Sequence, residues 1–139
     1  MQIDNIEIAI PALYVLAGMI YAIPVAFFDR EMIKLEKVGF WYHNVKTWFH
    51  IVALMYGSYL LGFTWIQAFW LMLIFHTAYS LVFDILLNVL RGLHWNYIGK
   101  TAQFDKLARK LFKNGETYAF VKAFMIFTIS LIFTIYYGV

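Results

Sequence analysis

Four long apolar runs dominate this chain and restrict it to folds that satisfy backbone hydrogen bonds inside a lipid bilayer. They cover about residues 8–28, 44–61, 64–90 and 118–139. At a rise of about 1.5 Å per residue, helices of these lengths cross or nearly cross the roughly 30 Å hydrocarbon core. A transmembrane β-barrel would need alternating segments of only about ten residues. The sequence therefore predicts an all-α integral membrane bundle of four transmembrane helices, forming a single domain over residues 1–139.

Composition and spacing support this interpretation. Hydrophobic residues make up 63% of the chain and charged residues only 14%, which is unlike a soluble domain. Only Gly62 and Phe63 separate the second and third runs, so we expect a tight antiparallel hairpin with Gly62 at the reversal. The third run would form about 40 Å of helix, which predicts that it is tilted.

All eleven lysine and arginine residues lie between runs one and two, between runs three and four, or just inside the start of run two or run four. The N-terminal tail, the Gly62 turn and the C-terminal end contain none. The positive-inside rule therefore places both long loops in the cytoplasm or interior and both termini outside.

The second long loop contains a basic amphipathic segment over about residues 101–113. Its apolar residues recur with helical spacing at Phe104, Leu107, Ala108, Leu111 and Phe112. Its basic residues occupy other positions: Lys100, Lys106, Arg109, Lys110 and Lys113. A shorter segment over residues 30–38 has a similar pattern. These residues predict either interfacial helices packed on the bundle, or a basic face that binds anionic lipids, nucleic acid or a protein partner.

Asp84 is the one acidic residue inside a predicted span, and such groups raise a functional hypothesis by default. With helical spacing, Asp84, Asn88 and Arg91 share one face, so a structural polar stripe also explains them. His50 is expected at a similar depth on the neighbouring helix, where it could pair with Asp84. The candidates for a proton or ion relay are therefore His50, Asp84 and Asn88, with fixing of helix register as the alternative.

Other chemistries lack the residues or the spacing that they need. The chain has no cysteine, no metal-ligand motif and no glycine-rich phosphate loop. His50 and His76 lie at different depths, which argues against a haem between them. His76, Ser80 and Asp84 follow one helix face, but Asp84 would lie about 12 Å from His76, too far to orient it. We therefore expect no catalytic residue, no metal site, no cofactor and no enzymatic activity.

One loop segment resembles a known group of proteins. The sequence from Arg91 to Ala102, RGLHWNYIGKTA, followed by Asp105, is similar to a segment of small uncharacterised membrane proteins encoded by bacterial viruses and prophages. It covers about a tenth of the chain and contains no catalytic residue. The resemblance implies a viral or prophage context, and with it a viral internal membrane or the bacterial inner membrane of an infected cell.

These observations lead to two functional expectations of different kinds. The first is a non-enzymatic, oligomerising membrane protein that acts as a scaffold or structural component and presents a basic inner face. Its expected partners are the bilayer, with anionic lipids at the inner face, and further copies of itself or an assembly partner. Nucleic acid is a further partner class, for which no motif argues. The alternative function is a small proton or ion conductor.

Overall fold

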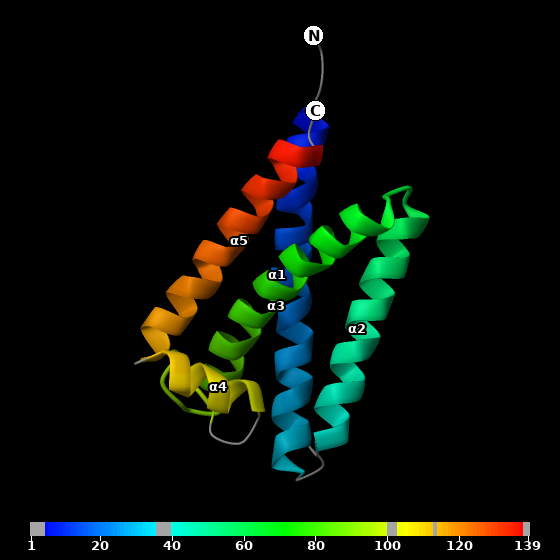
Figure 1. The fold of residues 1–139 in the computed structure, drawn as a ribbon. Coiled ribbons are helices and arrows are strands. Elements are labelled where there is room, and N and C mark those ends of the chain that lie inside the picture. Colours follow the sequence, from blue (N-terminus) through cyan, green and yellow to red (C-terminus); the bar gives the residue numbers. More distant parts are fainter. Residues whose placement is uncertain (1–4, 36–39, 100–102, 113, 138–139) are drawn as a thin grey trace.

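The computed structural model describes residues 5–35, 40–99, 103–112 and 114–137, and these residues form helices joined by short connections, without a strand. The helices are α1 (Asn5–Lys34), α2 (Phe40–Leu60), α3 (Trp65–Leu90), α4 (Gln103–Leu111) and α5 (Gly115–Tyr137). Figure 1 shows the start of α1 and the end of α5 together at one end of the molecule, and α4 near the opposite end. The protein is therefore all-helical, as expected.

Three of the described helices are long and apolar enough to cross a membrane. These candidate spans are Ala9–Lys34 in α1, Trp65–Leu90 in α3 and Gly115–Tyr137 in α5. The fourth expected span forms helix α2, but its first half carries Asn44, Lys46 and His50 and lowers its apolar character. In the described part of the chain, three helices therefore meet the criteria of length and composition for crossing a membrane, which indicates a membrane-embedded protein.

Helix α1 is longer than the apolar run that predicts it. It passes through Pro11 and Pro24, continues beyond Asp29 and ends at Lys34. The expectation of a separate amphipathic helix over residues 30–38 is therefore wrong for residues 30–34, which are the last turn and a half of α1. Residues 36–38 lie outside the described part of the chain. A charged residue ends an apolar run, but it does not end a helix whose backbone hydrogen bonds can continue.

The turn between α2 and α3 has the geometry that its sequence predicts. Gly62 adopts a positive φ of 96°, which a residue without a side chain tolerates best. Thr64 then caps α3, because its hydroxyl accepts a hydrogen bond from the Gln67 amide and the Gln67 side chain accepts one from the Thr64 amide. The expected helical hairpin is therefore confirmed.

Helix α3 is the centre of the packing. It makes its most extensive contacts with α1 and also packs against α5 and α2. Gly18 of α1 lies directly on the α3 backbone, where an added Cβ would be 2.5 Å from the Phe75 carbonyl oxygen. The buried Ala22 packs close by against Phe75 and Tyr79. Small residues on α1 thus bring two long helices together, and α3 crosses α1 at an angle (Figure 1).

Candidate functional site

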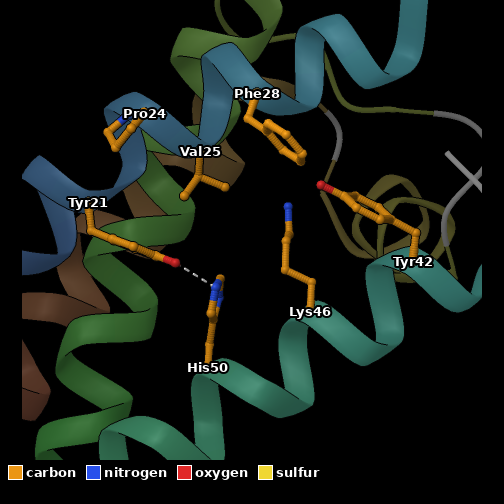
Figure 2. A pocket seen from close by; sticks show the side chains of 7 residues that line it. All are labelled: Tyr21, Pro24, Val25, Phe28, Tyr42, Lys46 and His50. Carbon is orange, nitrogen blue, oxygen red and sulfur yellow. Dashed lines mark hydrogen bonds between the residues drawn. The ribbon is translucent and has the colours of Figure 1, made fainter. Parts of the chain in front are cut away.

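An open cleft of about 440 Å³ lies between α1 and α2. In the described chain, these two helices are not among the pairs that share extensive backbone contact. Side chains therefore line and bridge the space between them (Figure 2). The cleft is lined by three aromatic residues, two aliphatic residues and two basic residues: Tyr21, Phe28, Tyr42, Pro24, Val25, Lys46 and His50.

Polar contacts cross from α1 to α2 at three levels. Nearest to the Gly62 turn, the Tyr14 hydroxyl bonds the Ser58 hydroxyl at 2.8 Å. At the middle level, the Tyr21 hydroxyl lies 2.8 Å from Nε2 of His50 (Figure 2). At the third level, Asp29 accepts hydrogen bonds from two residues of α2 and forms an ion pair. Side-chain hydrogen bonds thus connect α1 to α2 along most of their length.

Asp29 is the most buried charged group described. Its Oδ2 lies 2.5 Å from Nζ of Lys46, and its Oδ1 accepts a hydrogen bond of 2.7 Å from the Tyr42 hydroxyl. The Asp29 side chain is 0% exposed and that of Lys46 is 18% exposed. Asp29 directly follows the first apolar run, and hydropathy alone does not indicate that it pairs with a residue of the second run. A signal was present, because Lys46 is a basic residue at the start of the next run.

Asp84 pairs with Lys122 of α5, and not with His50. Its Oδ2 lies 2.5 Å from Nζ of Lys122, which also lies 4.3 Å from the ring centre of Tyr118. Lys122 is 11% exposed and Asp84 is 42% exposed. The expected contact between His50 and Asp84 is wrong, since His50 bonds Tyr21 of α1. The depth of a residue along its helix can be estimated from the sequence, whereas the neighbouring helix that its side chain faces cannot.

Asn88, the third relay candidate, anchors the connection that follows α3. Its side-chain amide donates to the carbonyl oxygens of Trp95 at 3.2 Å and Tyr97 at 2.7 Å. These carbonyls belong to a connection without regular structure, so a buried donor satisfies them in place of water. The structure thus assigns the three relay candidates to three separate contacts.

Helix α4 divides its basic residues between two roles. Lys106 and Lys110 are exposed, next to the exposed Leu107 and Leu111. Arg109 instead donates to the carbonyl oxygens of Ile98 and Gly99. Ala108 is buried and faces the protein. Of the remaining predicted basic residues, Lys100 and Lys113 lie outside the described part of the chain.

Among the residues that the structure describes, no three histidine or acidic residues come together as a metal site would require. Ser80 donates its hydroxyl hydrogen to the Thr77 carbonyl oxygen, so it is not directed at His76. The polar side chains described above join the helices through buried hydrogen bonds and two ion pairs.

Comparisons of the chain with protein-family models, with curated proteins and with solved structures gave no match.

Proposed function

We propose that this protein is a non-enzymatic structural component of a membrane, in which four helices form a bundle that assembles with further copies or with a partner protein. The observation that supports the proposal is that the polar side chains within the bundle bond to neighbouring helices. Asp29, Lys46, Asp84 and Lys122 form interhelical ion pairs, and His50 bonds a tyrosine of the neighbouring helix. Polar groups engaged in this way give the bundle a defined register.

Helix α2 is the fourth span in this proposal. The Gly62 turn makes it antiparallel to α3, and its side chains bond α1 at three levels. Its outward surface is apolar and exposed at Val45, Trp48, Phe49 and Val52. Such a surface needs lipid or a neighbouring protein to cover it. Both termini then lie outside and both basic loops lie in the cytoplasm or in a virion interior.

The exposed face of α4 supports contact with anionic lipid. Two leucines, Leu107 and Leu111, stand beside two lysines, Lys106 and Lys110, as in helices that lie in a membrane interface. Replacing both lysines by glutamine should lower the amount of anionic phospholipid retained during purification, and raised salt should do the same to the unaltered protein. Lys34→Gln is the matched control, because Lys34 is an exposed lysine at the end of α1.

The assembly itself is tested by the mass of the purified protein in lipid nanodiscs. A discrete multiple of 16.4 kDa, or a stoichiometric partner, supports the proposal. A monomer in native lipid without any partner contradicts it. In a viral or prophage context, the same complex should be recovered from the virion membrane or from the inner membrane of infected cells.

The alternative is a proton or ion conductor that uses His50, Asp84 and Asn88. The positions of these residues argue against a common path, because His50 faces α1 and Asp84 faces α5. Vesicles containing the protein and a pH-sensitive dye decide between the functions. We expect proton flux equal to that of empty vesicles. Proton flux above that level that is lost in the Asp84→Asn/Lys122→Met double variant would contradict the scaffold function and support a conductor.

A further inference from the structure

The cleft between α1 and α2 opens sideways on the surface of the bundle. Two of its aromatic walls are well exposed, since Phe28 is 57% exposed and Tyr21 is 39% exposed. Its volume of about 440 Å³ lies within the range of about 300–1,000 Å³ that is typical of sites for small ligands. In a membrane-embedded bundle, exposed rings at this position contact lipid. An amphiphile of the bilayer can therefore enter the cleft directly from the membrane.

Polar and apolar side chains occupy different levels of the cleft (Figure 2). Lys46 lies toward the start of α2, and Pro24 and Val25 form an apolar wall on α1. The hydrogen bond between Tyr21 and His50 bounds the cleft at the level farther from the start of α2. This division matches a ligand with a polar head near Lys46 and an apolar chain along Pro24 and Val25.

Lys46 gives the cleft a positive charge. Its ammonium group has three N–H donors, one of which bonds Asp29. Asp29 is fully buried and does not line the cleft, and none of the described residues that do line it is acidic. The cleft thus presents the positive member of the ion pair and hides the negative one. An anionic oxygen in the cleft can therefore accept a charge-assisted hydrogen bond from Lys46.

The level of Lys46 along the helices matches that of a lipid headgroup. Lys46 lies six residues after Phe40, where α2 begins, and Asp29 lies five residues before Lys34, where α1 ends. At about 1.5 Å per residue, both helices extend about 7–9 Å beyond the ion pair. The headgroup layer of one leaflet is about 5–8 Å thick, since a bilayer of about 40–45 Å has a hydrocarbon core of about 30 Å. Helices whose ends reach water therefore place this pair near the boundary between headgroups and hydrocarbon.

We propose that this cleft binds one anionic phospholipid, whose phosphate accepts a hydrogen bond from Lys46 and whose acyl chain lies along Pro24 and Val25 as far as the Tyr21–His50 bond. Basic pockets between spanning helices on the cytoplasmic side are a known type of lipid headgroup site. The site rests on the proposed function in one respect, namely that α2 spans the membrane beside α1. It is separate from the exposed lysines of α4, which contact the membrane surface.

Filling the cleft tests whether the lipid lies there. Pro24→Trp and Pro24→Ala both remove the proline, but only tryptophan adds bulk to the wall of the cleft. The delipidated full-length protein is titrated with phosphatidylglycerol in mild detergent, and native mass spectrometry counts the bound lipid. We expect Pro24→Trp to bind the first phosphatidylglycerol about tenfold or more weakly than Pro24→Ala, because the indole occupies the space of the acyl chain.

Ile23→Trp is the matched control, because it adds the same ring at an exposed position that does not line the cleft. It should bind phosphatidylglycerol like the unaltered protein. Equal affinities of Pro24→Trp and Pro24→Ala would overturn the site.

The headgroup is tested on the unaltered protein, so the result does not depend on the folding of any variant. We expect phosphatidylglycerol to bind about fivefold more tightly than phosphatidylcholine with the same chains, because only the former carries a net negative charge that Lys46 attracts. Asp29→Asn/Lys46→Gln, which replaces the ion pair by two neutral amides, should bind the two lipids equally. Equal binding of the two lipids to the unaltered protein, or binding of oleate as tight as that of phosphatidylglycerol, would overturn an anionic phospholipid as the ligand.

The exposed lysines of α4 separate this site from the proposed function. Lys106→Gln/Lys110→Gln should still bind one phosphatidylglycerol with unchanged affinity, because neither lysine lines the cleft. A monomer that binds this single lipid would contradict the proposed assembly and leave the site intact. An assembled complex in which Pro24→Trp does not weaken lipid binding would contradict the site and leave the assembly intact.

Discussion

At the scale of the residue, burial differs sharply between the two ion pairs. Asp29 is fully buried beside Lys46, whereas Asp84 is 42% exposed beside the nearly buried Lys122. A buried charge without its partner is far more costly than an exposed one, because water cannot replace the lost contact. The loss of stability on removing one member of an ion pair therefore depends on how deeply the remaining charged member is buried.

Lys46→Met should destabilise the protein by about 3–5 kcal/mol, because it leaves Asp29 charged and buried. Lys122→Met should cost only about 1 kcal/mol, since water can solvate the exposed side of Asp84. Unfolding in mixed detergent micelles measures both. Adding Asp29→Asn to Lys46→Met should recover part of the loss, and a double variant less stable than Lys46→Met alone would refute the ion-pair explanation.

At the scale of the element, two glycines inside helices have opposite surroundings. An added Cβ on Gly18 would lie 2.5 Å from the Phe75 carbonyl oxygen and 3.1 Å from the Tyr79 amide nitrogen, both in the α3 backbone. An added Cβ on Gly57 would meet nothing within 4 Å. Gly18 therefore allows α1 to approach α3, whereas Gly57 has no such role within the chain.

Gly18→Ala should destabilise the protein by about 1–3 kcal/mol, because two backbones must move apart. Gly57→Ala should leave stability unchanged or raise it by up to about 1 kcal/mol, since alanine favours the helix. The two melting temperatures, measured in the same detergent, are compared directly. A larger loss for Gly57→Ala would point to an interface with another chain at that position.

Two neighbouring basic residues of helix α4, Arg109 and Lys110, have different roles. Arg109 donates to the carbonyl oxygens of Ile98 and Gly99 and lies 5.5 Å from the ring centre of Tyr97, whereas Lys110 is exposed. The connection before α4 is thus tied to the helix by an arginine whose planar head can bond two carbonyls at once.

Arg109→Gln should make the connection over residues 92–99 several-fold more sensitive to limited proteolysis, because its carbonyls lose a charged donor. Lys110→Gln is the matched control and should leave the cleavage rate unchanged. Cleavage rates are read by mass spectrometry of the fragments. Equal rates for the two variants would show that Arg109 does not hold this connection.

At the scale of the whole molecule, the helix order produces two chemically different ends. The start of α1, the Gly62 turn and the end of α5 lie toward one end, while the end of α1, the start of α2 and the basic helix α4 lie toward the other (Figure 1). An even number of spans would return the C-terminus to the side of the N-terminus, which agrees with the proposed orientation.

Single cysteines test this orientation without further engineering, because the chain contains no cysteine of its own. In intact cells of a bacterial host, Leu61→Cys, in the exposed turn after α2, should react with an impermeant thiol reagent. Leu35→Cys and Lys110→Cys should react only after the membrane is permeabilised. All three positions are exposed in the structure. Labelling of Lys110→Cys in intact cells would invert the proposed topology.

The sequence by itself determined the helical class, the hairpin at Gly62 and the approximate bounds of each long helix. These features depend on local properties, namely the length of apolar runs, the backbone freedom of glycine and the capping by Thr64. Each can be seen in a short window of sequence. The extension of α1 to Lys34 was missed because a charged residue ends hydropathy and not helical hydrogen bonding.

The tertiary structure alone decided which polar side chains meet. Asp84 was recognised from the sequence, but its partner, Lys122, is 38 residues away on a helix whose facing side depends on rotation and crossing angle. The same holds for Asp29 with Lys46, and for His50 with Tyr21. The physical reason is that the rotation of each helix about its axis is set by packing against its neighbour, as where Gly18 lies on the α3 backbone. Such packing is a property of two helices together and cannot be seen in the sequence of one.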